Sequence, residues 1–336
     1  MITRRRFSAR LLAAAGVAAA PAFASEPYPS RPVRLVVGLA PGGIADQTAR
    51  IIAPKLAEVL GQQVVVENRT GAGGAIATRA VAGSAPDGYT LLVAFDGTHV
   101  TIPASNPAAG FDPVADFAPI GKIVDAPVLV TAHPSFPAND FREFVQLSRR
   151  LLSSGGSAGR LFDYGTAGVG STGHLTMELL KLRLNLFAVH IPYRGGGDAR
   201  AQLLGRQIPL MLAAVPTTSG DIRAGTLKGL AVTSARRSPV LPTVPTLSEL
   251  GFAELRGLDI NSWVGLAAPA RTPVAVVERL NSALHQVLAA DDVQQRLVQT
   301  GSVPVRSSPA AFATQIAGDL ERWRKVIAES HLRLDV

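Results

Sequence analysis

Short apolar runs alternate with segments of helical periodicity from residue 33 onward. Val33–Leu39 is short and mainly apolar, which is typical of a buried strand. In the next segment, Ile44–Leu60, residues suited to a core recur every three or four positions, which predicts a helix. The buried face of that helix is expected to consist of Ile44, Thr48, Ile51, Ile52, Leu56 and Val59.

The same alternation continues to residue 328. Further strands are predicted at Val64–Glu67, Tyr89–Phe95, Val128–Ala132, Leu161–Thr166, Ala188–Tyr193, Ile208–Ala213, Leu227–Thr233 and Trp263–Ala267. Further helices are predicted at Ala75–Ala82, Phe141–Leu152, His174–Leu184, Asp198–Leu204, Thr217–Ala224, Pro273–Leu288, Val293–Thr300 and Pro309–Ala328. Strands that alternate with helices indicate an α/β protein, and these strands divide naturally into two mostly parallel sheets.

The first 24 residues have the three parts of a secretory signal peptide. Arg4–Arg6 is basic, Leu11–Ala20 is apolar, and Ala22-Phe23-Ala24 has the form of a cleavage site. Cleavage is therefore expected after Ala24, with the mature protein in the periplasm. Thr3–Phe7 also resembles the twin-arginine motif, so twin-arginine and Sec export are both open.

Length, cysteine content and charge exclude several classes of protein. The 336 residues fit two domains of ordinary size, and 47% of them are hydrophobic. Cys is absent, which excludes disulfides, thiolate metal sites and cysteine nucleophiles. Of the 33 basic residues, four lie in the signal segment, which leaves 29 against 25 acidic residues. No later segment concentrates Lys and Arg with aromatic residues, so no nucleic-acid partner is expected.

Three glycine-rich segments each follow a predicted strand and precede a predicted helix: Pro41–Asp46, Gly168–Gly173 and Tyr193–Asp198. Exposed amides at a helix N-terminus suit a carboxylate or another anion. Asp46 either caps these amides or binds an ammonium group of a ligand. Arg194 is either a carboxylate clamp or a surface charge.

Gly168–Gly173 reads G-x-G-x-x-G, which also occurs in dinucleotide-binding sites. Such sites need an acidic residue at the end of the next strand, and here that strand ends at Arg194. The segment is therefore better suited to holding an anion through the hydroxyls of Ser171 and Thr172.

No catalytic or metal-binding arrangement is apparent. Ser171 lacks the preceding glycine of a nucleophile elbow, because Val169 stands there, and His174 is too close in sequence to act as the base of a triad. The histidines show no spacing typical of metal ligands. We therefore expect a binding protein with no cofactor rather than an enzyme.

The chain resembles the extracytoplasmic solute receptors of tripartite tricarboxylate transporters, also called the Bordetella uptake gene product family. The matching segments are Pro41–Asp46, Val65–Arg69, Gly71–Gly74, Ala85–Leu92, Gly170–Leu175, His190–Gly196, Ala231–Ala235, Arg237–Pro239, Pro242–Thr246, Trp263–Leu266 and Ala268–Pro269. They follow the order of the family over nearly all of residues 31–328.

The resemblance implies a two-lobed type II periplasmic-binding fold in which the chain crosses twice between lobes. The crossings are expected near Val124–Pro127 and Leu258–Ser262. Residues 25–126 and 258–336 would then form lobe 1, and residues 127–257 would form lobe 2.

The resemblance also implies a ligand site in the cleft between the lobes. Lobe 1 would contribute Leu39, Gly42, Gly43, Ile44, Ala45, Asp46, Thr98 and His99. Lobe 2 would contribute Thr166, Gly170, Ser171, Thr172, Tyr193 and Asp198. Where family members commonly have a polar side chain, this sequence has Met211-Leu212-Ala213-Ala214, which favours a ligand with an apolar or aromatic tail.

The expected function is capture of a small organic carboxylate for the membrane subunits of a tripartite transporter, by a monomeric receptor. Two alternatives are a secreted dinucleotide-binding oxidoreductase and a ligand sensor for a signalling partner. The sequence alone does not separate transport from sensing.

Overall fold

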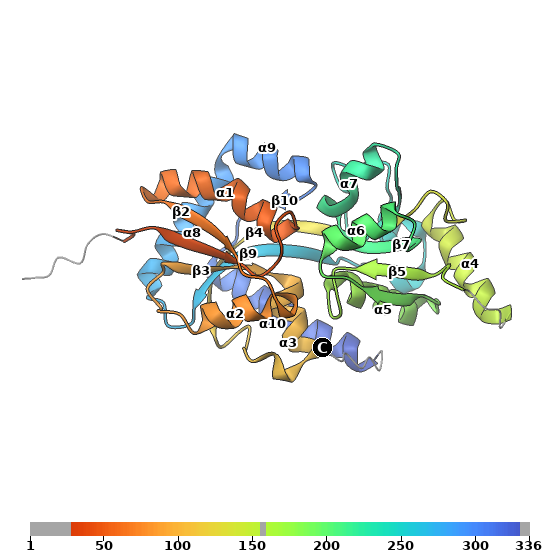
Figure 1. The fold of residues 1–336 in the computed structure, drawn as a ribbon, viewed down its shortest axis with the longest axis horizontal. Coiled ribbons are helices and arrows are strands. Elements are labelled where there is room, and N and C mark those ends of the chain that lie inside the picture. Colours follow the sequence, from red (N-terminus) through yellow and green to blue (C-terminus); the bar gives the residue numbers. More distant parts are fainter. Residues whose placement is uncertain (1–27, 155–158, 330–336) are drawn as a thin grey trace, which may run out of the picture.

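The computed structural model describes residues 28–154 and 159–329 (Figure 1). The predicted signal peptide, residues 1–24, lies outside the described residues. Among the helices of the described ranges, none is long and apolar enough to cross a membrane.

The first half of the molecule is built on a sheet with strand order β2-β1-β3-β9-β4. Its strands are β1 (Val33–Val37), β2 (Val64–Asn68), β3 (Thr90–Phe95), β4 (Phe117–Ala132), β9 (Asn261–Pro269) and β10 (Val303–Pro304). Strand β1 is parallel to β2 and β3, whereas β9 is antiparallel to both β3 and β4. The two-residue strand β10 pairs antiparallel with β4.

Helices cover both faces of this sheet, because side chains alternate along each strand. Val33, Leu35 and Val37 of β1 belong to one core, and Val36 belongs to another. The first core includes residues of α1 (Ile44–Leu60), α8 (Val274–Ala289) and α9 (Asp291–Thr300). The second includes residues of α2 (Ala75–Ala82), α3 (Ile102–Ser105) and α10 (Pro309–Glu329).

The second half is built on β4 together with β5 (Asp163–Thr166), β6 (Val189–Pro192), β7 (Leu210–Ala214) and β8 (Lys228–Val232). Its helices are α4 (Phe141–Ser154), α5 (Thr172–Leu184), α6 (Gly196–Leu204) and α7 (Val215–Arg223). Short helical turns lie at Ala72–Gly74, Gly97–Thr101, Pro107–Ala109, Leu247–Leu250 and Ala253–Leu255.

Strand β4 belongs to both halves. Its residues Phe117–Pro127 pair with β9, and Val128–Ala132 pair with β7 and β8. The predicted crossing at Val124–Pro127 therefore lies inside one continuous strand, visible in Figure 1 between the halves. The chain comes back immediately before β9, where the Ile260 amide still bonds to Thr233 in the second half (3.1 Å).

The sheets are mixed, and the expectation of mostly parallel sheets is wrong in this respect. Strands β4 and β9 cross the boundary in opposite directions, so they pair antiparallel with each other. Strand β4 also pairs antiparallel with β7 and β8. Among the named strands of the described chain, parallel pairing is found for β1 with β2 and β3, and for β5 with β6 and β7.

Candidate ligand-binding cleft

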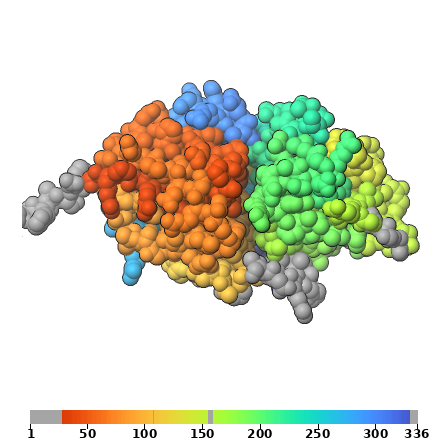
Figure 2. All heavy atoms as spheres, in the orientation of Figure 1, coloured from red at the N-terminus to blue at the C-terminus, as the bar shows by residue number. Residues whose placement is uncertain are grey.

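A cleft lies at the boundary between the two halves, where Figure 2 shows their surfaces meeting. It consists of two adjoining cavities of about 680 Å³ and about 610 Å³. Both volumes fall in the range typical of small-molecule sites. The residues shared by the two cavities come from both halves and are Leu39, Ala40, Phe95, Ala167, Ser171 and Arg194.

The loop that follows β1 forms part of the first wall. Leu39, Gly43 and Ile44 line the cleft, as expected, whereas Gly42, Ala45 and Asp46 do not line either large cavity. Helix α1 begins after Gly43, which provides no side-chain cap among the described contacts. The unpaired amides of its first turn therefore face the cleft, and so does the positive end of the helix dipole.

Asp46 holds this loop in shape. Its carboxylate accepts hydrogen bonds from the Gly42 amide (2.9 Å), Arg50 Nε (3.0 Å) and Asn68 Nδ2 (2.9 Å). Burial alone would raise the pKa of Asp46, but the hydrogen bonds from Arg50, Gly42 and Asn68 outweigh burial and lower it. Of the amides at this helix start, Asp46 therefore caps that of Gly42 in the preceding loop, whereas the first turn of α1 has no side-chain cap among the described contacts. The Gly42 amide is therefore already hydrogen-bonded and is not one of the exposed amides expected at this helix start.

A glycine-rich turn completes the first wall and was missing from the expected site. Gly71, Ala72, Gly73 and Gly74 line the first cavity together with Thr98. The Thr98 hydroxyl donates to Gly73 O (2.7 Å), so Thr98 both lines the cleft and fixes this turn. Gly71–Gly74 belongs to a segment that carried the family resemblance, and that resemblance was the available signal.

His99, expected in the cleft, lies in the core. Its side chain is fully buried, with its ring centroid 4.7 Å from that of Phe117 and 6.5 Å from that of Trp263. Burial lowers the pKa of His99 to about 4. His99 lines neither of the two large cavities and instead borders a cavity of about 10 Å³ beside Leu39, Phe95 and Thr98.

The loop between β5 and α5 forms the second wall. Ser171 lines both cavities and caps α5, since its Oγ accepts from the His174 amide (3.4 Å). No acceptor for the Ser171 hydroxyl hydrogen is found in the described part of the chain. Ser171 therefore offers a hydrogen-bond donor to a ligand.

Thr172 has a different role from the one expected. It borders the second cavity, but its hydroxyl donates to Asp96 Oδ2 in the first half. Asp96 Oδ1 accepts from Ser262 Oγ (2.5 Å) and the Trp263 amide (3.3 Å). Burial raises the pKa of Asp96 to about 7, although the bonds from Ser262 and Thr172 act in the opposite direction. The Thr172 hydroxyl is thus committed to a contact between the halves.

Thr166 and Gly170, also expected at the site, lie behind the cleft wall. The Thr166 hydroxyl bonds to His190 Nε2 (2.7 Å), and the Gly170 amide donates to His174 Nδ1 (3.1 Å). Neither residue lines the two large cavities. They support the loop whose Ala167, Gly168, Val169 and Ser171 face the ligand space.

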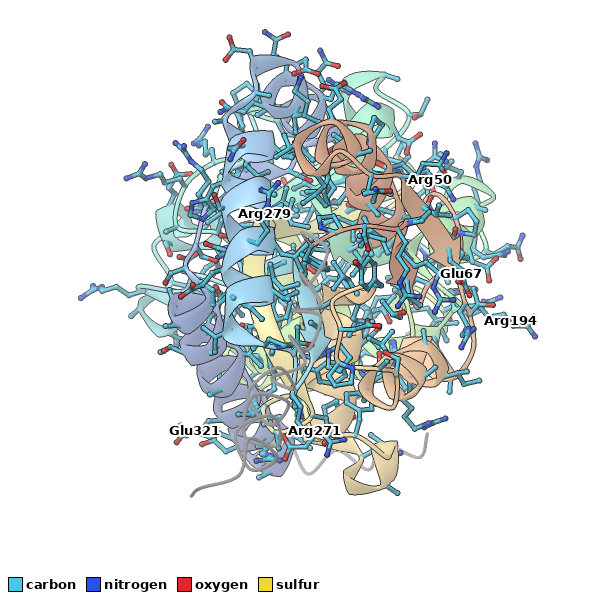
Figure 3. All side chains as sticks on the ribbon, turned by 90° about the vertical axis from the view of Figure 1, so that its left-hand side faces the viewer. Arg50, Glu67, Arg194, Arg271, Arg279 and Glu321 are labelled. Atoms are coloured by element: carbon cyan, nitrogen blue, oxygen red, sulfur yellow. The ribbon has the colours of Figure 1, made fainter. Side chains whose placement is uncertain are left out.

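Tyr193, Arg194 and Asp198 lie at the third glycine-rich segment, where α6 begins. Tyr193 lines the first cavity, Asp198 lines the second, and Arg194 lines both. The Arg194 side chain is exposed, and Figure 3 labels it on the same side of the molecule as Arg50 and Glu67. Among the described residues that line the two cavities, Arg194 is the one cation.

The rest of the cleft is largely apolar. Phe95, which the sequence did not single out, borders both cavities, and Leu212, Ala213 and Ala214, from the segment noted for its missing polar side chain, line the second. These residues lie at the ends of β3 and β7, where ligands commonly bind in α/β sheets. No cluster of His, Asp and Glu suited to a metal ion is found among the described residues.

The G-x-G-x-x-G segment occupies the strand-to-helix position of a dinucleotide fingerprint, but its surroundings differ from such a site. A Cβ on Gly173 would lie 2.4 Å from Leu212 O, so this glycine permits close packing of α5 on β7. The next strand, β6, ends at Pro192 and is followed by Tyr193 and Arg194. The position of the ribose-binding carboxylate is therefore not filled by an acid.

Comparison with known sequences gives the same family that the motifs indicated. Residues 48–332 match the model of the tripartite tricarboxylate transporter family receptor. The protein in the tcbD–tcbE intergenic region of Pseudomonas sp. strain P51 is 36% identical over 332 residues, covering 98% of this chain and 96% of the relative. BugT of Bordetella pertussis is 33% identical over 324 residues, covering 96% of each chain.

Solved structures agree with this match. A protein of R. palustris with adipate has a TM-score of 0.83 and 32% identity, covering 90% of this chain and 98% of that one. The periplasmic binding protein BugD has a TM-score of 0.80 and 34% identity, covering 90% and 99%. MatC from Rhodopseudomonas palustris with bound malate has a TM-score of 0.80 and 33% identity, covering 89% and 100%.

The likeness to the periplasmic binding protein BugD and to the other solved structures confirms the expected α/β fold of a two-lobed, type II binding protein. The family match extends over most of the sequence, and relatives above 30% identity cover nearly its whole length. The chain therefore belongs to the receptor family of the tripartite tricarboxylate transporters.

Proposed function

We propose that this protein is a periplasmic receptor that captures a small carboxylated solute between two lobes and delivers it to a tripartite transporter. Lobe 1 would comprise residues 25–126 and 258–336, and lobe 2 residues 127–257, after removal of residues 1–24. The observation that carries the proposal is the cleft, which combines a free hydroxyl, a cation and uncapped helix N-termini. The adipate and malate in related structures support a carboxylate ligand.

The polar groups of the cleft suit a carboxylate. The first-turn amides of α1 and α6 have no side-chain cap at Gly43 and Gly195 among the described contacts. Both helix ends favour negative charge, and the Ser171 hydroxyl adds a directed donor. Hydrogen bonds to an ionised group contribute roughly 1.5–3 kcal/mol each, so a few of them suffice for specific binding.

Arg194 suits a second anionic group. Its guanidinium presents donors in a planar fork that matches a carboxylate. Because Arg194 borders both cavities, it lies within reach of a ligand that extends from one cavity into the other. This arrangement favours a dicarboxylate over a monocarboxylate.

The apolar part of the wall suits a carbon chain between the charged ends. Leu39 and Phe95 border both cavities, and Leu212 and Ala213 face the second. Burial of apolar surface contributes roughly 25 cal/mol per Å², without demanding hydrogen-bond partners. We infer an aliphatic or aromatic spacer rather than a hydroxyl-rich tricarboxylate.

A thermal-shift screen of the purified mature protein tests this proposal. Adipate, malate and other mono- and dicarboxylates are compared with NAD⁺ and NADP⁺ at one ionic strength. Stabilisation by a dicarboxylate, reduced in Arg194→Gln, is the expected result, since a ligand that binds only the folded state raises its stability. Stabilisation by a dinucleotide alone would contradict the proposal. Uptake of the active carboxylate by cells with and without the gene then tests delivery to a transporter.

A further inference from the structure

Two histidine rings lie stacked directly behind the second wall of the cleft. His174 comes from α5 and His190 from β6, and their ring centroids are 3.7 Å apart with planes only 10° from parallel. His174 is buried and His190 is half-buried. Neither residue lines the two large cavities, so neither is placed to contact the ligand directly.

The His174 ring is hydrogen-bonded directly to the loop that faces the ligand space, and the His190 ring is linked to it through Thr166 at the end of β5. His174 Nδ1 accepts from the Gly170 amide (3.1 Å), so this nitrogen carries no hydrogen. The neutral ring therefore has its hydrogen on Nε2. This acceptor fixes the amide immediately before Ser171, whose hydroxyl faces the cleft.

His190 acts on the same loop through Thr166. The Thr166 hydroxyl donates to Gly168 O (3.0 Å) and accepts from the Gly168 amide (3.2 Å). A hydroxyl has a single hydrogen, so with that hydrogen directed to Gly168 O, we assign the imidazole as the donor in the 2.7 Å contact with His190 Nε2. Both histidines are thereby assigned the same neutral tautomer, with hydrogen on Nε2.

The loop depends on these outside contacts for its shape. Gly168 and Gly170 adopt positive φ values of 136° and 72°. Because glycine populates positive and negative φ about equally, these two residues do not by themselves favour this loop conformation. Within the loop, the Ser171 amide donates to Gly168 O (3.2 Å). Among the described residues, the two imidazoles make the side-chain hydrogen bonds that reach Thr166 and Gly170 from outside the loop.

A positive charge on either ring would have no free counter-ion. Tyr164 from β5 has its ring 5.1 Å from that of His190, and its hydroxyl donates to Glu178 of α5 (2.9 Å). Glu178 also forms an ion pair with Lys181 (2.8 Å), so its charge is already compensated. These are the titratable groups that face the pair from β5 and α5.

The pKa values of both imidazole rings are low, chiefly because the rings are buried. Burial lowers the pKa of His174 to about 4, with Glu178 raising it and Lys181 lowering it. Burial lowers the pKa of His190 to about 3, and His174 and Lys181 lower it further. Both rings are thus uncharged at neutral pH.

We propose that the stacked, neutral His174–His190 pair positions the Gly168–Ser171 loop for ligand binding, and that charging His174 releases the loop. A hydrogen on His174 Nδ1 would face the Gly170 amide hydrogen. Two donors that face each other cannot form a hydrogen bond, so this contact would be lost. The loop would then move away from His174, and the Ser171 hydroxyl would no longer be held at the cleft. This proposal rests on the proposed carboxylate-binding function of the cleft.

Substitutions at His174 separate positioning from packing. His174→Phe keeps an aromatic ring against His190 but removes the acceptor for Gly170. His174→Asn restores an acceptor near the position of Nδ1 without a titratable ring. His133→Phe is the matched control, because His133 is also buried in the second half and its Nδ1 accepts a backbone amide, that of Ser135 (3.1 Å).

Calorimetric titration with adipate and with malate is the first measurement. His174→Phe should weaken binding about tenfold, because one well-made hydrogen bond corresponds to about that factor. His174→Asn should recover most of the loss, and His133→Phe should bind like the wild type while losing comparable thermal stability. Equal affinity in His174→Phe and wild type, or no recovery in His174→Asn, would overturn the proposal.

Nitrogen-15 NMR of the ligand-free protein gives a second measurement that is independent of the ligand. At about pH 6, where an ordinary histidine is largely charged, the spectra should show both rings neutral with hydrogen on Nε2. The Gly170 amide should exchange more rapidly in His174→Phe than in wild type. A charged ring or hydrogen on Nδ1 at this pH would overturn the proposal even if no tested carboxylate binds. Failure of every carboxylate with the expected spectra would instead count against the proposed function.

Discussion

The Thr172 hydroxyl donates to the Asp96 carboxylate across the boundary between the two halves of the molecule. Asp96 follows β3, and Thr172 is the first residue of α5. The same carboxylate also accepts from Ser262 and from the Trp263 amide at the start of β9. One fully buried carboxyl group therefore ties the beginning of a cleft-facing helix to the strands that connect the halves.

Thr172→Val should lower the free energy of unfolding by about 1–3 kcal/mol, because it leaves a buried carboxyl oxygen without its donor. Thr176→Val is the matched control on the same helix, since the Thr176 hydroxyl is buried and has no hydrogen-bond partner within the described structure. Urea denaturation of the ligand-free proteins measures the loss of unfolding free energy in each variant. Equal losses in the two variants would show that the Asp96 contact is not stabilising.

The pH dependence of stability should reveal the buried Asp96. Its pKa of about 7 lies above the ordinary value of 3.8, chiefly because of burial, so folding favours its protonated form. Its contribution is present below the ordinary pKa and is lost as the pH rises through about 7. Asp96→Asn does not titrate at this position. Wild type should therefore lose stability relative to Asp96→Asn between about pH 4 and about pH 8. Denaturation at a series of pH values measures both proteins, and a difference in unfolding free energy that stays constant with pH would contradict this.

Asp46→Asn should destabilise the loop before α1 and weaken ligand binding together. The change removes the charge that attracts Arg50, and it replaces one carboxylate oxygen by an amide nitrogen, so either Gly42 (on Oδ2) or Asn68 (on Oδ1) loses its acceptor. Because Arg50 is half exposed, the loss of unfolding free energy should stay near 1 kcal/mol rather than reach the value for a buried pair. Lys55→Ala, which removes an exposed ion pair on the same helix, is the control. Denaturation curves and a titration with the active carboxylate measure both effects, and unchanged affinity in Asp46→Asn would contradict this prediction.

Ligand binding should draw the lobes together. A ligand that contacts both lobes favours the closed form by its difference in affinity for the two forms. Small-angle scattering at saturating carboxylate should give a smaller radius of gyration than the ligand-free protein. An unchanged radius in a sample whose binding is verified by calorimetry would argue against closure.

Local patterns predicted several elements to the residue. Helix α1 has the predicted bounds Ile44–Leu60, because its apolar spacing is regular and Gly61 ends it in a left-handed conformation. Helix α2 likewise begins and ends as predicted. In contrast, most of β4 was missed, since Pro119, Gly121 and Pro127 interrupt its apolar pattern. Its partner β9 is also distant in sequence.

The site was predictable only as far as neighbouring residues define it. Ser171 was placed in the cleft because a glycine-rich loop and a helix start surround it in the sequence. The partner of Thr172 lies 76 residues away, and no local pattern links the two. His190 likewise approaches Thr166 from another strand, so the supporting role of Thr166 depends on how the strands pair.

The most direct test of the account is a calorimetric titration of the carboxylate that stabilises the protein most, on wild type and on Ser171→Ala. Arg223→Gln, which changes an exposed arginine that does not line the cleft, serves as the control. We predict one site per chain, an affinity about tenfold or more lower in Ser171→Ala, and no change in Arg223→Gln. Equal affinity in wild type and Ser171→Ala, or no carboxylate binding at all, would contradict the placement of a carboxylate in this cleft.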